Sequence, residues 1–350
     1  MFGRCTEHAL RSAMQLPCST VLGASERERL PRRADFPGGP LRKQPAVTTL
    51  ITSVPPRRAP GAVPVGPVGR CLARVLLARG ESVRVLCVHS EASGWPEGVE
   101  IVEGSVLRPA EAPSAFAGID RLFLAGATPE VRTGRPHSVS EVVSRAVEGG
   151  ASAIVVLSSH GPVFEKALPP EQWRWLAVER AVEASPVAWT HIRPSAVMAS
   201  MLAGGYPPTG SCWAEVIRAS RVVREPYGDA RYPFIDEEDL AALAATVLFD
   251  PGYAGSVLDV LGPPISARQR ASLIGEAIGE TVTFEELTPD EARLLWRSQG
   301  WPEETIEVTL WAQSQFLAQP SISDPTVERI LGRAPRTFAD WLQRHVEAFS

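Results

Sequence analysis

A long insertion between a predicted strand and a predicted helix most constrains what this chain can fold into. The apolar, β-branched run 47–52 predicts a buried parallel strand, and Gly66 and Gly69 open an apolar helix that ends near Gly80. Residues 53–65 stand between these two elements, where a strand–glycine–helix unit normally places about three residues. The order of elements predicts an anion-binding site at the start of the helix.

Strand, glycine turn and helix in this order open a Rossmann-type dinucleotide-binding fold. Its first glycine makes the tight turn, its second admits a pyrophosphate to the backbone, and its third packs helix on strand. Ser53 takes the first place here, and Gly66 and Gly69 take the second and third. Ser53, Gly66 and Gly69 are therefore predicted to bind the cofactor.

The insertion bears on cofactor binding more than on folding. Lengthening a loop from three to thirteen residues costs roughly 1.3 kcal/mol, which a domain of this size can absorb. A proline-rich loop, however, supplies few backbone N–H groups for a phosphate. Arg57 and Arg58 could clamp an anion instead, or form a solvated basic turn. A local frame error over 54–65 is a further alternative.

Charge, cysteines and hydropathy exclude several classes of protein. Residues 1–60 hold ten Arg/Lys against four Asp/Glu, so the rest of the 350-residue chain is acidic, within a net charge of −5. An acidic body argues against nucleic acid, and no apolar run reaches the roughly 18 residues that span a membrane. The five cysteines form no CxxC pair, so neither a zinc site nor a disulfide framework is expected, and a reducing cytoplasm fits best.

The chain divides into an extension and a folded part. Residues 1–45 are rich in Arg, Pro, Gly and Ser and are predicted to be disordered; an extended or misassigned start is favoured over a transit peptide. From 46 onward, strands and helices alternate, which predicts an α/β fold with a doubly wound parallel sheet over about 46–195. The regular alternation of strands and helices then ends, which predicts a smaller C-terminal α/β lobe over about 196–350.

The element ranges predicted after the first helix follow this division. In the first part the strands are 83–88, 100–102, 121–124, 153–157 and 187–192, and the helices are 69–79, 138–148 and 171–184. In the second part the strands are 256–261 and 281–286, and the helices are 266–278, 290–298, 303–317 and 337–349.

The order and spacing of several segments carry a family resemblance; they are 66–70, 99–104, 118–124, 155–159, 187–194, 234–239 and 331–341. With them the chain resembles the NmrA-like branch of the atypical short-chain dehydrogenase/reductases. The resemblance runs from about Val47 to Phe349. It implies a Rossmann domain for NAD(P)(H), a cleft between two lobes, and roles from reduction of quinones or other small molecules to redox sensing without turnover.

One departure from the wider family concerns catalysis. Many short-chain enzymes use a Tyr-x-x-x-Lys pair, in which lysine lowers the tyrosine pKa so that tyrosine can protonate a carbonyl oxygen. None of the four tyrosines here has a lysine four residues later, and the helix after the fifth strand offers Trp173 and Trp175 instead. Classical ketone chemistry is therefore disfavoured, while acceptors that take hydride without a positioned acid, such as quinones, remain open.

A second departure concerns cofactor recognition. The resemblance implies an arginine for NADP after the second strand, but His89 and Ser90 stand there, and no acidic residue for NAD does either. His89 and Ser90 could donate to a phosphate, or they could be an ordinary surface loop. Ser105 follows the third strand near the expected adenine, and Gly126 and Ala127 follow the fourth, under the expected nicotinamide. The cofactor is expected to be NADP or NAD, with NADPH favoured.

The candidate catalytic residues lie where a strand ends, because ligands bind at the carboxyl ends of strands in open α/β sheets. Ser158 and Ser159 end the fifth strand and could hydrogen-bond a substrate oxygen, or they could cap a turn; His160 could deliver a proton. Arg193 ends the sixth strand, either in the same cleft or as a structural partner of Glu179 or Asp236.

Aromatic and sulfur-containing side chains suggest an apolar pocket for a flat ligand, although most of them would equally suit a core. The predicted substrate-binding residues are Trp173, Trp175, Met198 and Trp213. The hypothesis that follows is an NAD(P)H-dependent oxidoreductase for a small quinone-like or conjugated acceptor, as a monomer or homodimer. The alternative is a non-catalytic nucleotide-sensing regulator or interaction protein that keeps the fold.

Overall fold

A computed structural model describes most of the chain beyond the predicted extension. The described residues are 47–53, 65–89, 93–126, 137–160, 162, 165–166, 175–202, 213–301, 303–318 and 324–350. The extension 1–45 and most of the insertion, 54–64, lie outside them.

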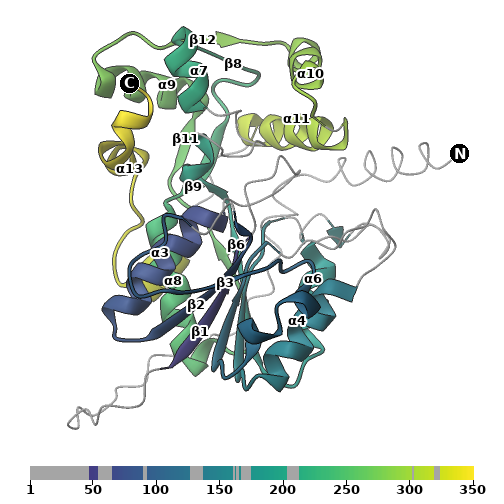
Figure 1. Cartoon of the computed structure of the whole chain (residues 1–350). Helices are drawn as coiled ribbons and strands as arrows, with labels where there is room; N and C mark the ends of the chain where they lie inside the picture. Colours follow the sequence, from purple (N-terminus) through teal and green to yellow (C-terminus); the bar gives the residue numbers. More distant parts are fainter. Residues whose placement is uncertain are drawn as a thin grey trace, which may run out of the picture.

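Seven of the described strands form one parallel sheet, which occupies the lower half of Figure 1. From edge to edge they are β10 (Ser256–Val260), β6 (Ala188–Pro194), β5 (Ala153–Leu157), β4 (Arg121–Leu124), β1 (Thr48–Thr52), β2 (Ser82–Cys87) and β3 (Glu100–Glu103). The strand order reverses between β1 and β4, which is the switch point where Rossmann folds bind a dinucleotide. The predicted α/β, doubly wound fold is confirmed.

Alternating side chains explain why the sheet has helices on both faces. In β1, Ile51 belongs to one buried hydrophobic cluster and its neighbour Leu50 to the other, because successive side chains of a strand point to opposite faces. α3 (Val65–Ala78) and α8 (Glu237–Phe249) cover the first face, and α4 (His137–Glu148) and α6 (Trp175–Glu183) cover the second (Figure 1). The core of this layer is thus apolar on both sides of the sheet.

The upper part of Figure 1 is built mostly from the C-terminal half of the chain. Its core contains Trp213, Phe234 and Trp341, all almost fully buried. Its strands are β7 (Ala196–Val197), β9 (Arg231–Ile235) and β11 (Pro264–Ser266) in one sheet, and β8 (Val222–Glu225) and β12 (Thr283–Glu286) in another. Its helices are α7 (Trp213–Ser220), α9 (Ala267–Ile278), α10 (Pro289–Ser298), α11 (Glu303–Ala318) and α13 (Phe338–His345).

Several features of the C-terminal half differ from the expected arrangement, and α7, β8, β9 and β11 were not predicted. The predicted strand 256–261 was assigned to the smaller lobe, but β10 is an edge strand of the main sheet, paired with β6. α8 was not predicted, and it packs with α3 on that sheet. The chain therefore returns to the sheet over residues 237–260. A division of the chain near residue 195 stays a prediction.

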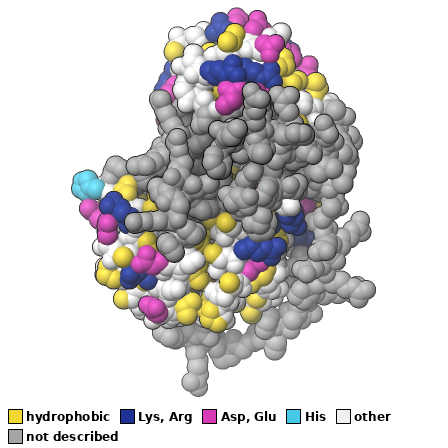
Figure 2. Space-filling model, turned by 90° about the vertical axis from the view of Figure 1, so that its right-hand side faces the viewer, with side chains coloured by type: hydrophobic (Ala, Val, Ile, Leu, Met, Phe, Trp, Pro, Cys, Tyr) yellow, Lys and Arg dark blue, Asp and Glu magenta, His cyan; other side chains and the backbone are white. Residues whose placement is uncertain are grey.

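Surface features bear on possible partners. Within the described ranges, no helix is long and apolar enough to cross a membrane. On the face shown in Figure 2, the coloured surface carries both basic and acidic side chains, and they lie close together in the upper part.

Candidate active site

The start of α3 lies over the carboxyl end of β1. Gly66 falls in the first turn of α3, where backbone N–H groups have no helical acceptor. A Cβ at Gly69 would lie 3.1 Å from the Trp95 ring, which would have to shift slightly, and 3.5 Å from Ile51 of β1, which is an ordinary van der Waals contact. Ser53 is buried, and its hydroxyl has no hydrogen-bond partner among the described residues. These features fit a dinucleotide pyrophosphate.

The expected adenine end of the cleft holds an exposed ion pair. His89 Nδ1 lies 2.8 Å from Glu103 Oε1, and the hydrogen bond with this carboxylate raises the pKa of His89. Ser90 lies outside the described residues. Ser105 Oγ accepts a hydrogen bond of 3.2 Å from the backbone N–H of Leu107, as a turn residue does. Glu103 was not anticipated, although an acidic residue at the end of a strand was visible in the sequence.

At the expected nicotinamide position, β1 and β4 are joined by a side chain. Thr52 Oγ1 donates to the carbonyl oxygen of Ala125 and accepts from its N–H, both at 2.8 Å. Gly126 follows with φ of 74°, a conformation that favours glycine. Ala127 lies outside the described residues. The carboxyl ends of β1 and β4 are thereby held together at the switch point.

The end of β5 carries a buried polar network. Ser158 Oγ donates to Glu179 Oε1 at 2.6 Å, and Arg193 donates to both Glu179 oxygens at 2.9 and 2.6 Å. Of the two partners considered for Arg193, the structure therefore shows Glu179; Asp236 contacts Arg344 instead. The Ser158 hydroxyl is engaged within the protein, and its predicted contact with a substrate stays a prediction, as does that of Ser159.

His160, two residues beyond Ser158, has a different environment. Both ring nitrogens are enclosed and make no hydrogen bond within the described part of the chain. Nδ1 lies 3.8 Å from Oδ1 of Asp259, a residue that sequence reasoning did not single out. Burial lowers the pKa of His160 to about 4, with a further contribution from the positive charge of Arg193. Asp259 could have been noticed as the acidic residue of an otherwise apolar strand end.

The predicted pocket residues lie in well-packed surroundings. Met198 and Trp213 belong to the hydrophobic core of the upper part, and Trp213 Nε1 donates to Glu225 Oε1 at 2.8 Å. Trp175 begins α6 and is buried. Trp173 lies outside the described residues. This arrangement favours the alternative that Met198 and Trp213 are core residues; their contact with a substrate stays a prediction.

One described cluster has the composition of a metal site. Oxygens of Glu179 and Glu183 and a ring nitrogen of His191 all lie within 4.8 Å of one another. Both oxygens of Glu179, however, already accept hydrogen bonds from Arg193. The Arg193 guanidinium thus supplies the positive charge that a metal cation would bring. We interpret the cluster as an ion-pair network.

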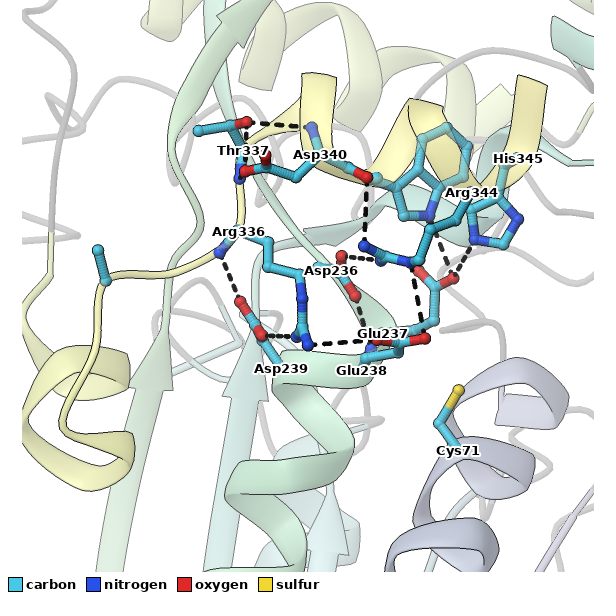
Figure 3. A network of polar contacts seen from close by, with 12 residues as sticks. Cys71, Asp236, Glu237, Glu238, Asp239, Arg336, Thr337, Asp340, Arg344 and His345 are labelled. Carbon is cyan, nitrogen blue, oxygen red and sulfur yellow. Dashed lines mark hydrogen bonds and ion pairs between the residues drawn. The ribbon is translucent and has the colours of Figure 1, made fainter.

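The segments 234–239 and 331–341, which carried part of the resemblance, meet at the start of α8 (Figure 3). Asp236 caps the helix by accepting a hydrogen bond of 2.7 Å from the N–H of Glu238. The indole of Trp341, in α13, donates to Glu237 at 3.0 Å. The motif residues therefore attach the C-terminal helix to the sheet layer, which is a structural task.

A parallel sheet with a glycine-containing helix over its first strand defines a dinucleotide-binding protein of the Rossmann class. A family model described as NAD(P)H-binding matches residues 65–251, more than half of the chain. The chain belongs to this NAD(P)H-binding family, as the resemblance to NmrA-like proteins predicted, and its cofactor is NAD(P)H.

Two of the similar proteins with known names are reductases. The chain is 33% identical over 288 residues, 81% of its length, to the (4-alkanoyl-5-oxo-2,5-dihydrofuran-3-yl)methyl phosphate reductase of Streptomyces griseus, of which it covers 96%. It is 28% identical over 261 residues, 72% of its length, to an NAD(P)H azoreductase of Xenophilus azovorans, of which it covers 84%.

Solved structures with the same fold include two further reductases. An NADPH-dependent quinone oxidoreductase of Escherichia coli has a TM-score of 0.61 at 16% identity, covering 85% of this chain and 99% of that one. The triphenylmethane reductase of Citrobacter sp. has a TM-score of 0.61 at 18% identity, covering 86% and 99%. At such identities they show the fold alone.

Proposed function

We propose that this protein is an NAD(P)H-dependent reductase of a small conjugated acceptor, such as a quinone or an α,β-unsaturated carbonyl compound. The observation that carries the proposal is His160, whose enclosed ring has no hydrogen-bond partner among the described residues. It lies at the carboxyl end of β5, the edge where ligands bind in open α/β sheets. A buried polar group left without a partner is costly unless a ligand satisfies it.

The similarity to the Streptomyces griseus reductase supports this acceptor class. The name of that enzyme describes a substrate with a 2,5-dihydrofuran ring that carries a 5-oxo and a 4-alkanoyl group. The ring double bond of such a compound is conjugated with carbonyl groups, so a hydride can add to carbon while the negative charge moves to oxygen. This chemistry does not require the Tyr-x-x-x-Lys pair, which the present sequence lacks.

Bound NAD(P)H would supply the hydride. Residues at the switch point of the sheet would hold the cofactor. Ser53, Gly66 and Gly69 would surround the pyrophosphate, and His89 would face the ribose of the adenine half. Gly126 and Ala127 would lie beneath the nicotinamide. Ser158 would position the end of β5 through its hydrogen bond to Glu179, which Arg193 also binds. His160 would contact the acceptor oxygen.

The test is consumption of NADPH and NADH by the purified full chain in the presence of a quinone, an azo dye and an unsaturated lactone with and without a phosphate ester. Steady multiple turnover with one acceptor is expected, and His160→Gln should lower kcat at least tenfold. Glu285→Gln, which changes an exposed ion pair far from the site in sequence, serves as the control. Binding of NADPH without turnover of any acceptor would instead favour a nucleotide-sensing regulator.

A further inference from the structure

We propose that Asp259 is a positioning residue for His160, and that the two side chains together hold the proton that the reduced acceptor takes up. This inference rests on the proposed function and adds to it a second residue, contributed by a different strand.

The topology brings the two residues to the same edge of the sheet. His160 follows β5, and Asp259 is the fourth residue of β10, separated from β5 by β6. All three strands run parallel, so their carboxyl ends lie side by side, and Asp259 pairs in register with Arg193 of β6. A residue from the C-terminal half of the chain thereby reaches the predicted catalytic position.

The contact between the two side chains is close and otherwise unsatisfied. His160 Nδ1 and Asp259 Oδ1 are 3.8 Å apart, and their side chains are 17% and 23% exposed. Both ring nitrogens and this carboxylate oxygen are enclosed, and none has a hydrogen-bond partner in the described ranges. A separation of this size shortens to a hydrogen bond with a small movement, and catalytic hydrogen bonds are often long before a substrate binds.

The charges around the pair leave it without another strong partner. Arg193 faces both side chains, but its guanidinium is held by Glu179. Asp324 acts on both groups from the segment before α12 (Thr326–Leu331), and its carboxylate accepts from the N–H of Thr326. Burial raises the pKa of Asp259, and the negative charges of Asp324 and Glu179 raise it further, whereas Arg193 and Lys166 lower it. The raised pKa of Asp259 and the lowered pKa of His160 bring the two groups towards the same pH range.

The proton balance of the reaction defines what each residue does. The acceptor gains a hydride at carbon, its C=C electrons move towards the carbonyl, and its oxygen becomes negative. The protonated ring of His160 gives the Nε2 proton to this oxygen, and the electrons of that N–H bond stay on the ring. Nδ1 keeps its own proton throughout and donates it in a hydrogen bond to Asp259, so the ring leaves the step as a neutral tautomer. Water returns a proton to Nε2 once the product has left.

Kinetics over a range of pH test the pair in the working enzyme. Reduction should be fastest at the acid side, because the pair must carry its proton, and kcat should fall as pH rises. Asp259→Asn should lower kcat about tenfold with little change in KM. It should also lower the pH at which kcat begins to decrease. Asp259→Glu should recover part of the loss. Asp229→Asn, an exposed aspartate of a surface ion pair, should match the wild type. An unchanged pH profile in Asp259→Asn would overturn the proposal.

A second measurement on the full chain tests whether Asp259 sets the tautomer of His160, even if no acceptor is turned over. Nitrogen chemical shifts of the histidine rings, assigned with His160→Gln, report which ring nitrogen carries the proton. The wild type should hold the proton of His160 on Nδ1, and Asp259→Leu should shift the population towards Nε2. Asp259→Asn provides the same comparison if the leucine variant does not fold. Equal tautomer populations in wild type and variant would refute the pair, whereas absent turnover alone would refute the proposed function.

Discussion

His160 ties the stability of the protein to pH through its burial. Its pKa is about 4 in the folded chain, against an ordinary value of 6.5. As pH falls below 6.5, the unfolded chain binds a proton at this ring before the folded chain does, so the free energy of unfolding decreases towards pH 4. The full difference corresponds to roughly 3 kcal/mol.

We therefore expect His160→Gln to lose less stability than the wild type between neutral pH and pH 4, by about 2 to 3 kcal/mol. Urea unfolding at the two pH values measures it, and Glu285→Gln is the control because its side chain is largely exposed. Equal losses in the wild type and His160→Gln would show that this ring does not titrate as its burial implies.

His89 makes a testable distinction between the two cofactors. Its pairing with Glu103 favours the protonated, positive ring at the carboxyl end of β2, where the ribose of a dinucleotide is expected. His89→Ala should raise KM for NADPH roughly tenfold and leave KM for NADH nearly unchanged, with a larger effect at acid pH. Glu103→Gln tests the charge of His89 separately, because it keeps the imidazole and removes the carboxylate that favours its protonated form. An equal change for both cofactors would place His89 away from the 2′-phosphate.

At the scale of elements, the start of α8 is the point where a single change should loosen the C-terminal helix. The Asp239 side chain is fully buried and accepts a hydrogen bond from Arg333 at 2.5 Å. It also accepts one from the N–H of Arg336 at 2.6 Å and forms an ion pair with the Arg336 guanidinium (Figure 3). Asp239→Asn should cost about 2 kcal/mol, because the buried side chain loses its charge-assisted contacts with both arginines, although Arg336 keeps its ion pair with Glu238 at 3.3 Å.

Urea unfolding and limited proteolysis of the chain end around α13 would measure this loss. Glu238→Gln is the matched control: it lies beside Asp239 on the same helix turn but is 38% exposed, so it should change stability by less than about 1 kcal/mol. Similar effects of the two substitutions would mean that the buried contact does not hold α13 in place.

The same elements show what the sequence could and could not predict. β4 and β5 were predicted at their exact bounds because short apolar runs bounded by glycine or polar residues have few alternatives. α8 was missed because its residues are buried on most sides, which removes the apolar stripe that marks a surface helix. β10 was recognised as a strand but placed in the wrong layer, since hydrophobic alternation does not say which sheet a strand joins.

For the molecule as a whole, the sequence predicted only part of the candidate site. Ser158 and His160 were proposed as candidates because strand ends are where open sheets bind ligands, and their roles stay predictions. Asp259 could be noticed as an acidic residue in an apolar strand, but not as a neighbour of His160, because it lies about one hundred residues further on and reaches His160 only through the pairing of β10 with β6. Trp213 and Met198 were expected at a pocket, yet aromatic and sulfur-containing side chains in a sequence do not distinguish a pocket from the core they occupy here.

Binding of the cofactor should be visible as a property of the entire chain. A ligand at a hundred times its Kd adds about 2.7 kcal/mol to the free energy of unfolding, which raises Tm by several degrees for a protein of this size. We expect this shift with NADPH or NADH in the full chain. A variant lacking residues 55–63, which shortens the insertion to the usual turn length, should show at least the same shift, because Ser53, Gly66 and Gly69 remain. Loss of the shift in this variant alone would mean that the insertion, with Arg57 and Arg58, provides the contacts to the phosphates that the short turn provides in other Rossmann folds.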